Sequence, residues 1–239
     1  MRIAMWSGPR NISTAMMRSW GNRADCYVCD EPLYAHYLLK SGQNHPGREA
    51  TIAAQPGDWR EVADWLTGEI PGGKSVWYQK HMAHHLLPEI DRDWTRQLIN
   101  CFLIRDPREM ITSLIEFIPV PTVMDTGLPQ QVELFEDVRE RTGAVPPVID
   151  GRDVLENPEV VLSRLCEKVG TTFDESMLNW PPGIRETDGA WAPWWYDKVK
   201  PTTGFAGYRP KDDEVPNELT GVYEECVEYY AKLAEHKIN

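Results

Sequence analysis

Residues of types that can bind an anion stand close together near the start of this sequence. A short apolar segment, Ile3 to Trp6, runs into the turn Ser7-Gly8-Pro9, and Arg10 follows. Ser13 and Thr14 then begin a segment with the composition of a helix. Free N–H groups of a first helical turn, the helix dipole, hydroxyl donors and a guanidinium fork all favour phosphate or sulfate oxygens. The segment predicts phosphate or sulfate chemistry; the alternative is an ordinary strand and a helix with a serine N-cap.

A second cation stands at the end of another apolar segment. Arg105 follows Cys101 to Ile104, and Pro107 suits the first position of a helix. Ser113 comes eight residues after Arg105, in the second turn of that helix. An arginine at a strand end and a serine reaching back from the helix can hold one phosphate between them. A salt-bridged surface arginine with a solvated serine is the alternative.

Three histidines are candidates for a general base, because the pKa of histidine lies near neutral pH. His81, His84 and His85 follow the apolar segment Val76 to Gln79, so a strand end carries them toward the rim of the two anion-binding segments. Two alternatives stay open. His84 and His85 belong to a helix surface, or all three histidines ligate a metal from one helix face. No nearby carboxylate completes a metal site, and we expect none.

One segment imitates a nucleotide-binding loop. Gly68 to Ser75 matches the P-loop pattern G-x-x-x-x-G-K-[ST] in every letter. A P-loop follows a strand and opens a helix. Here the body of a predicted helix, Trp59 to Leu66, comes before the match, and a predicted strand, Val76 to Gln79, comes after it. We interpret the segment as a helix–strand loop.

A sheet must bring these segments together. Apolar runs alternate with helical ones, which favours an α/β fold with three layers: helices on both faces of a mostly parallel central sheet of about five strands. The predicted strands are Ile3–Trp6, Cys26–Cys29, Val76–Gln79, Leu98–Ile104 and Val148–Ile149. The predicted helices are Ser13–Gly21, Pro32–Lys40, Trp59–Glu69, His84–Glu89, Pro107–Phe117, Gln130–Arg141, Pro158–Val169 and Glu214–Glu235. Ligands bind beyond the carboxyl ends of parallel strands, so the loops Ser7–Asn11, Lys80–His85 and Arg105–Pro107 should meet at one site.

A long irregular segment, Trp180 to Pro210, is rich in Pro, Gly and Trp. Loops of that length are uncommon unless they are functional. Its aromatic residues either wall an acceptor pocket or fix the loop to the core; they are Trp191, Trp194, Trp195 and Tyr196. No repeat and no linker divides the chain, so we expect a single domain over residues 1–239.

Composition narrows the function further. The chain has 239 residues and a net charge of −12, which disfavours a nucleic-acid partner and polyanionic acceptors. No apolar run is long enough for a membrane span, and no secretion signal is visible, so we expect a protein without a membrane partner. Five widely spread cysteines suit a reducing cytoplasm. We expect a cytoplasmic protein with a small-molecule acceptor, and its oligomeric state is left open.

The anion-binding segments belong to a set of motifs that resembles the sulfotransferases that use 3′-phosphoadenosine 5′-phosphosulfate (PAPS). Pro9 to Thr14 resembles the family's 5′-phosphosulfate loop, and Arg105-Asp106-Pro107 through Ser113 resembles its 3′-phosphate motif. Asp153 to Gly170 resembles the helix entry after a central strand. Gly204-Phe-Ala-Gly207 resembles the C-terminal loop that closes over the nucleotide. The motifs stand in the family's order and cover most of the chain.

The resemblance implies the P-loop-like sulfotransferase fold and transfer of a sulfuryl group from PAPS, a cosubstrate, to a hydroxyl or amine of a small acceptor without a metal. It implies that His81 is the general base, with His84 as second choice, and that Arg10 stabilises the group in transfer. The residues implied to bind PAPS are Arg10, Asn11, Ile12, Ser13, Thr14, Arg105, Ser113, Thr203 and Gly204.

The sequence departs from the family pattern at several positions. Arg10 stands where many members have Lys, and Ile12 where Gly is usual. Gly151 replaces a Tyr that often contacts adenine, and Thr202-Thr203 replace a common Arg-Lys pair. Two other functions therefore stay open: a P-loop nucleotide kinase or NTPase of the same fold class, and a nucleotide-binding protein without catalysis.

Overall fold

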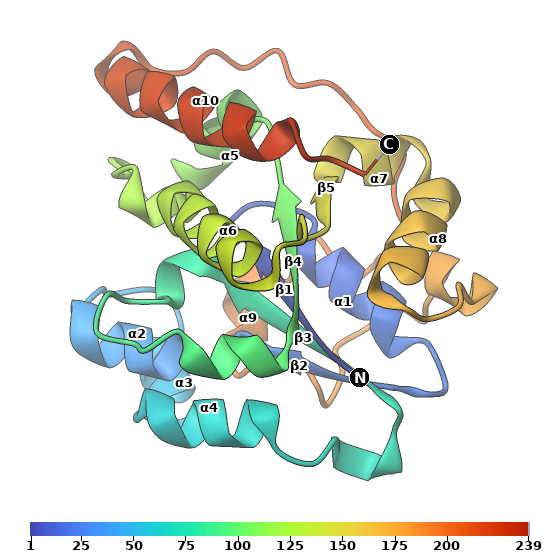
Figure 1. The fold of residues 1–239 in the computed structure, drawn as a ribbon. Helices are drawn as coiled ribbons and strands as arrows, with labels where there is room; N and C mark the ends of the chain where they lie inside the picture. The colour runs from blue at the N-terminus through green and yellow to red at the C-terminus, as the bar shows by residue number, and fades with distance from the viewer. Residues whose placement is uncertain (239) are drawn as a thin grey trace.

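A five-stranded sheet forms the centre of the computed structural model, which describes residues 1–238 (Figure 1). The strands lie in the order β2-β3-β1-β4-β5, and each neighbouring pair is parallel. Their bounds are β1 (Arg2–Ser7), β2 (Cys26–Asp30), β3 (Val76–Met82), β4 (Ile99–Ile104) and β5 (Val148–Asp150). All five predicted strands and the predicted α/β class are confirmed. The main difference is β3, which continues to Met82 instead of ending at Gln79.

Ten α-helices connect and cover the strands within residues 1–238. They are α1 (Ser13–Gly21), α2 (Tyr34–Ser41), α3 (Arg48–Ala54), α4 (Trp59–Thr67), α5 (Pro107–Leu114), α6 (Leu128–Thr142), α7 (Gly151–Glu156), α8 (Pro158–Val169), α9 (Ala192–Trp195) and α10 (Thr220–Ala234). None of these helices is long and apolar enough to cross a membrane.

Two helix predictions are wrong in an instructive way. In place of the helix expected from His84 to Glu89 there is one 3₁₀ turn, η2 (Ala83–His85). Pro88 disfavours helical backbone in the residue before it, so the helix cannot continue. The last helix begins at Thr220, not at Glu214, because Pro216 precedes a separate 3₁₀ turn, η6 (Asn217–Leu219).

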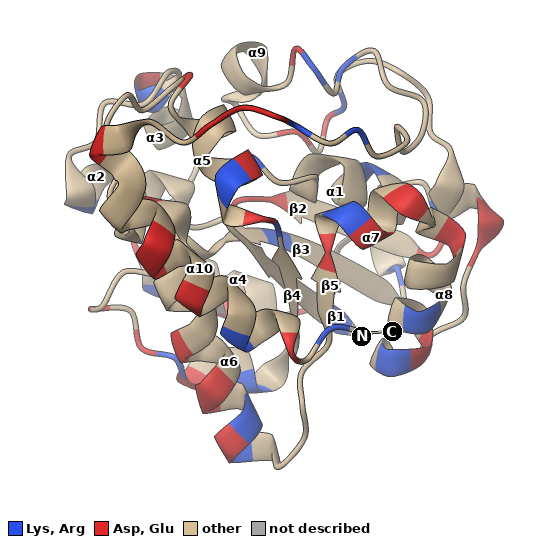
Figure 2. Cartoon of the chain, turned by 90° about the horizontal axis from the view of Figure 1, so that it is seen from above, with Lys and Arg blue, Asp and Glu red and all other residues tan. Residues whose placement is uncertain are grey.

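The two faces of the sheet have separate cores, as the alternation of β1 shows. Ala4 and Trp6 pack with α4, α5, α6 and α10, whereas Ile3 and Met5 pack with α1, α7 and α8. Successive side chains of a strand point to opposite faces, so this division follows from the strand geometry. Figure 1 shows the two groups of helices on either side of the sheet. The outer faces of α6 and α10 carry many of the acidic residues (Figure 2).

The connections create a crevice between β1 and β4, which are neighbours in the sheet. The chain leaves β1 toward β2, and it leaves β4 toward β5 on the other side. In open parallel sheets, ligands bind where neighbouring strands send their connections in opposite directions. The segments that follow β1 and β4 are the two that the sequence identified as anion-binding.

Candidate active site

A cavity of about 440 Å³ lies at the carboxyl edge of the sheet. Its walls come from the segments that directly follow each strand and from the long segment before α10. The lining residues used below are Arg10, Asn11, Ile12, Ser13, Thr14, Glu31, Tyr34, Tyr37, His45, Lys80, Met82, His84, His85, Arg105, Glu109, Ser113, Asp125, Gly151, Arg152, Trp191, Trp195, Tyr196, Lys198, Thr202, Gly204, Tyr208, Arg209 and Lys211. The predicted convergence of the three loops is therefore present.

The start of α1 gives the cavity an anion-binding wall. Ile12 is the N-cap residue and forms no side-chain cap, so the first-turn N–H groups have no hydroxyl or carboxylate cap from it. Ser13 and Thr14 add hydroxyl groups beside them. Uncapped N–H groups at the positive end of a helix dipole attract an anion. Arg10, which has a left-handed φ of 55°, lies next to this wall.

Two departures from the family pattern, Ile12 and Gly151, lie beside each other in the structure. Ile12 has φ −82° and ψ 21°, a backbone conformation open to any residue, so no glycine is required there. A Cβ added to Gly151 would lie 2.7 Å from Asn11 Oδ1 and 3.6 Å from the Ile12 side chain. The loop after β1 thus fills space beside α7 that only a glycine at 151 leaves free. Asn11 also holds the loop to the sheet, because its Nδ2 donates to Leu103 O at 3.2 Å.

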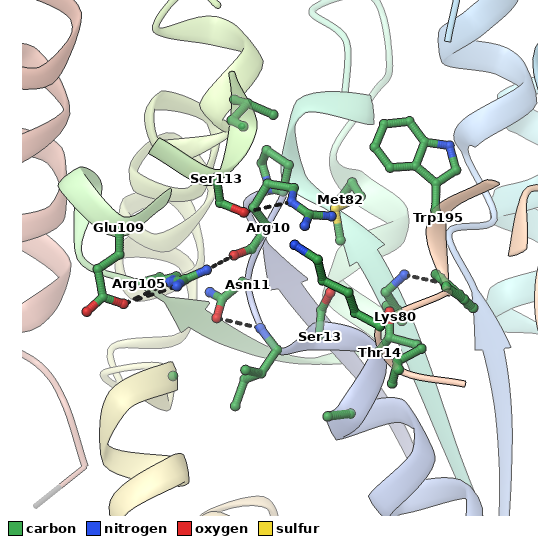
Figure 3. A pocket seen from close by; sticks show the side chains of 18 of the residues that line it. Arg10, Asn11, Ser13, Thr14, Lys80, Met82, Arg105, Glu109, Ser113 and Trp195 are labelled. Carbon is green, nitrogen blue, oxygen red and sulfur yellow. Dashed lines mark hydrogen bonds and ion pairs between the residues drawn. The ribbon is translucent and has the colours of Figure 1, made fainter. Parts of the chain in front are cut away.

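Arg10 and Arg105 join the two predicted anion-binding segments directly (Figure 3). Arg10 Nε donates to Ser113 Oγ at 3.0 Å, and the Arg105 guanidinium donates to the backbone oxygen of Arg10. Burial lowers the pKa of Arg10; the charge of Glu116 opposes this, and that of Arg105 adds to it. Two guanidinium groups crowded into one partly buried place favour an anion between them.

Glu109 fixes the orientation of Arg105. Its Oε2 accepts from Arg105 Nε and Nη2 at 3.2 and 3.1 Å, and its Oε1 accepts from the Tyr208 hydroxyl at 2.6 Å. Tyr208 also lies under the guanidinium of Arg152, 4.9 Å from the ring centre. Glu109 therefore ties α5 to the segment after Gly204, which passes over the cavity.

The C-terminal loop reaches the cavity with different residues from those expected. Gly204 lines it, but Thr203 is exposed and does not; Thr202 is the threonine at the wall. The prediction for Thr203 is corrected in this respect. Arg209 and Lys211, a few residues further on, line the cavity and supply cations near the place of the missing Arg-Lys pair.

His81 lies on the opposite face of the sheet from the cavity. Its ring stacks on Trp6 with centroids 4.2 Å apart, and its Nε2 lies 3.3 Å from Gln79 Oε1. The side chain is 1% exposed and does not line the cavity. Because β3 continues to Met82, side chains alternate through this stretch: Lys80 and Met82 face the cavity and His81 faces away. Burial lowers the pKa of His81 to about 3, so it is a neutral core residue.

Lys80 occupies the place expected for the base. Its Nζ donates to Asp30 Oδ1 at 2.8 Å, to Glu31 Oε1 at 2.5 Å and to the Tyr196 hydroxyl at 2.9 Å. Asp30 Oδ2 also accepts from Tyr196 at 2.5 Å and from the Gly189 N–H at 3.0 Å. The side chains of Lys80 and Asp30 are each 1% exposed. Motif reasoning missed Asp30 and Glu31, whose partners come from β3 and the long loop.

Glu31 is the acidic group that remains free to change protonation. Two carboxylates share the single charge of Lys80, and Asp30 already has two further donors. Burial raises the pKa of Glu31 to about 7, Lys80 opposes the rise, and the charge of Asp30 adds to it. Glu31 also has a φ of 40°, uncommon for a residue with a side chain. A carboxylate with a pKa near neutral, held in place at a cavity wall, suits proton transfer.

Aromatic rings and neutral imidazoles wall the other end of the cavity. Tyr34 and Tyr37 stack on His85 with centroids 4.5 and 4.7 Å apart, and His84 meets Tyr37 edge-on at 5.2 Å. Burial lowers the pKa of His84 to about 3, and His45 adds to this. Of the aromatic residues of the long loop, Trp191, Trp195 and Tyr196 line the cavity, whereas Trp194 is 47% exposed and does not.

The P-loop-like segment lies away from this site. Residues 68–75 connect α4 to the amino end of β3, at the opposite edge of the sheet. Lys74 donates to the backbone oxygen of Ala24 at 2.7 Å. The interpretation as a connecting loop is confirmed.

A family model and two solved structures are similar to this chain. A family model described as Sulfotransferase domain matches residues 1–231. The chain belongs to the sulfotransferase domain family. Two solved structures share the fold: the sulfotransferase domain from the curacin biosynthetic pathway (12% identity, TM-score 0.50, 94% of this chain and 96% of that one) and a sulfotransferase from Alicyclobacillus acidocaldarius (12%, 0.51, 100% and 97%). The fold predicted from the motifs is thereby confirmed.

Curated relatives of this sulfotransferase domain are longer proteins. Branched-chain-amino-acid aminotransferase-like proteins 1 and 2 of Arabidopsis thaliana are 32% and 31% identical to it over 235 residues. The match covers 98% of this chain but only 42% and 41% of those proteins. The chain thus spans about two-fifths of their length. Their names describe the longer proteins, and the activity in those names is not transferred to this domain.

Proposed function

We propose that this sulfotransferase domain moves a sulfuryl group from PAPS to a hydroxyl of a small acceptor. The observation that carries the proposal is the contact between two anion-binding elements across β1 and β4: Arg10 bonds to Ser113, and Arg105 bonds to the backbone of Arg10. A donor with phosphate groups at both its 3′ and 5′ positions matches two such elements side by side. A nucleoside triphosphate, whose phosphates form one chain, needs only one.

The residues at the cavity fit this donor. Arg10, Ser13, Thr14 and the first-turn N–H groups of α1 would hold the 5′-phosphosulfate. Arg105 and Ser113 would hold the 3′-phosphate, with Arg209 and Lys211 supporting them from the C-terminal loop. Tyr208 and Arg152, which stack on each other, offer a flat surface for adenine where the family's usual tyrosine is replaced by Gly151.

In the proposed mechanism Glu31, rather than His81, takes the proton of the acceptor hydroxyl. The acceptor oxygen forms a bond to sulfur as the bond from sulfur to the 5′-phosphate oxygen breaks, and 3′,5′-diphosphoadenosine leaves. Lys80 keeps Glu31 in position, and the charge of Arg10, with the N–H groups at the start of α1, stabilises the negative charge that develops on the sulfuryl and phosphate oxygens. Arg10 takes the part that Mg²⁺ has in phosphoryl transfer, so we propose that turnover needs no metal.

The first test is calorimetric titration with 3′,5′-diphosphoadenosine without magnesium, compared with ATP plus magnesium. We expect binding of the first ligand and about 10–100-fold weaker binding by Arg105→Ala, since a hydrogen bond to a charged group contributes about 1.5–3 kcal/mol. Arg96→Ala, an equivalent change at an exposed arginine paired with Asp93, is the matched control and should bind like the wild type. Binding of ATP with magnesium alone would contradict the proposal and support a nucleotide kinase.

The second test is transfer of labelled sulfate from PAPS to a panel of phenols, alcohols and amines in the presence of a chelator. Turnover of at least one acceptor supports the proposal. Tight binding of 3′,5′-diphosphoadenosine with no turnover of any acceptor would instead identify a nucleotide-binding protein without catalysis. Turnover that the chelator abolishes and magnesium restores would refute the metal-free mechanism.

A further inference from the structure

The acceptor end of the cavity has a carboxylate that no cation of residues 1–238 neutralises. Asp125 lies on the 3₁₀ turn η4 (Met124–Thr126) and lines the cavity. Its Oδ2 accepts from the N–H and the hydroxyl of Thr122 at 2.8 and 2.7 Å, which fixes the side chain and leaves Oδ1 for another partner. Within residues 1–238 no lysine, arginine or histidine forms an ion pair with it.

The other charges at this end are already paired. Lys80 binds two carboxylates, one of which is Glu31, and Lys198 lies 3.3 Å from Glu116. Among the described residues, Asp125 is therefore a cavity-lining carboxylate at the acceptor end without an ion pair. Arg10 and Arg209, which form no ion pair within residues 1–238, line the wall at the opposite, donor end, beside Lys211, which lies 3.9 Å from Asp213. The cavity is therefore positive at one end and negative at the other.

The histidines around Asp125 do not supply the missing charge. Burial lowers the pKa of His45 and of His84, the latter to about 3, although Asp125 raises both. Both rings are therefore neutral at neutral pH. The turn that carries Asp125 is packed closely on η2: a Cβ added to Gly127 would lie 3.3 Å from the backbone nitrogen of His84. The turn thus holds the carboxylate beside neutral aromatic groups.

Those neighbours form a surface that suits an organic cation. The ring centroid of Tyr37 lies 5.2 Å from that of His84 and 5.8 Å from that of His45. The charge of Asp125 acts to raise the pKa of all three groups. The buried Nδ1 atoms of His84 and His85 have no hydrogen-bond partner. Aromatic faces attract a cation, and a nearby carboxylate strengthens the attraction. An anionic acceptor would meet repulsion from Asp125 here.

We propose that the acceptor is a small alcohol or phenol that carries an ammonium group, with this group at Asp125 and Tyr37 and the hydroxyl at Glu31. The inference rests on the proposed function and specifies its acceptor. It places the two ends of the acceptor on residues that line one cavity and come from separate elements, η4 and the loop after β2.

The test compares acceptors of equal shape that differ in charge. Choline is paired with neohexyl alcohol, and tyramine with para-propylphenol. We expect kcat/KM to be about tenfold or more higher for the cation in at least one pair, as attraction of a cation to aromatic rings and a carboxylate implies. Asp125→Asn should reduce this ratio to near one. Asp93→Asn, the same change at an exposed position before β4, should preserve it.

The outcomes separate this inference from the proposed function. Equal kcat/KM within both pairs, or a preference that survives Asp125→Asn, overturns the inference. So does sulfation of neutral acceptors alone by a domain that binds 3′,5′-diphosphoadenosine. Unchanged calorimetric affinity for that nucleotide shows that Asp125→Asn is folded. If this variant does not fold, Tyr37→Leu replaces it as the test: it removes the ring, keeps the carboxylate and should also lower the ratio of kcat/KM between the cationic and the neutral acceptor. No nucleotide binding and no transfer to any acceptor would refute the proposed function itself.

Discussion

Replacing Lys80 by methionine should destabilise the domain more than any surface change. Methionine fills a similar volume but leaves Asp30, whose side chain is 1% exposed, without its counter-ion. Removing one partner of a buried ion pair costs about 3–5 kcal/mol. Asp30 keeps two neutral donors, the Gly189 N–H and the Tyr196 hydroxyl, so we expect the lower part of this range, about 3 kcal/mol.

The double variant Asp30→Asn/Lys80→Met makes the prediction sharper. It removes the charges of Lys80 and Asp30, and a neutral group in place of Asp30 costs far less than a buried charge left alone. Glu31 remains, but burial raises its pKa to about 7, so it can take up a proton. We expect it to recover at least half of the stability lost by Lys80→Met. Lys74→Met, at an exposed lysine of the loop before β3, is the matched control and should change stability by less than about 0.5 kcal/mol.

Urea unfolding followed by fluorescence measures these differences, with the m-value checked for constancy. For a domain of this size a loss of 3 kcal/mol lowers Tm by about 6–12 °C. A loss below about 1 kcal/mol for Lys80→Met would refute the reasoning, because it would mean that Asp30 is not a desolvated charge. A double variant less stable than Lys80→Met would refute it equally.

Three further changes test the site. Glu31→Gln should lower kcat by about 10²–10⁴-fold without weakening nucleotide binding. In the wild type, ionisation of Glu31 should make kcat rise with pH through about 7, and the variant should lose this rise. A pH–rate profile of the variant that keeps the rise would exclude Glu31 as the base. His81→Phe should retain turnover, and it should lose less stability on acidification than the wild type. The reason is that the unfolded state takes up the histidine proton near pH 6.5 and the folded state only near 3. Urea midpoints from pH 7 to 4 measure this difference, and abolished turnover in a folded His81→Phe would restore His81 as the base. Gly151→Ala should disturb the loop after β1, because the new Cβ would lie 2.7 Å from Asn11 Oδ1; unchanged nucleotide affinity in calorimetry would count against that contact.

Sequence reasoning placed the local elements correctly. The strand, turn and helix start around Arg10 are present as predicted, as are the strand and helix around Arg105, and both arginines line the cavity. The binding of an anion by them stays a prediction. The sheet was predictable because each strand is a short apolar run. The hydrogen bond between Arg10 and Ser113, 103 residues apart, was not predicted, because the sequence pairs Ser113 with Arg105.

The role proposed for Glu31 could not be predicted from the sequence, because the end of β3 was misjudged. With β3 ending at Gln79, His81 would belong to a loop and be free to face the cavity. With β3 ending at Met82, the two-residue period of the strand turns His81 to the opposite face and brings Lys80 to the cavity. Glu31 emerges only when Lys80 is seen to bridge β2, β3 and a tyrosine 116 residues further along.

The three donors around Asp30 also bear on how acceptor preference can change in this domain. Gly189 and Tyr196 attach the long loop to β2 through that single carboxylate, and the residues between them, including Trp191 and Trp195, form part of the acceptor wall. The residues proposed to bind the donor, Arg10, Arg105 and Ser113, lie on other segments. Exchange of residues 190–195 between relatives, with Gly189 and Tyr196 retained, is therefore a route to new acceptors that leaves the donor half of the cavity unaltered.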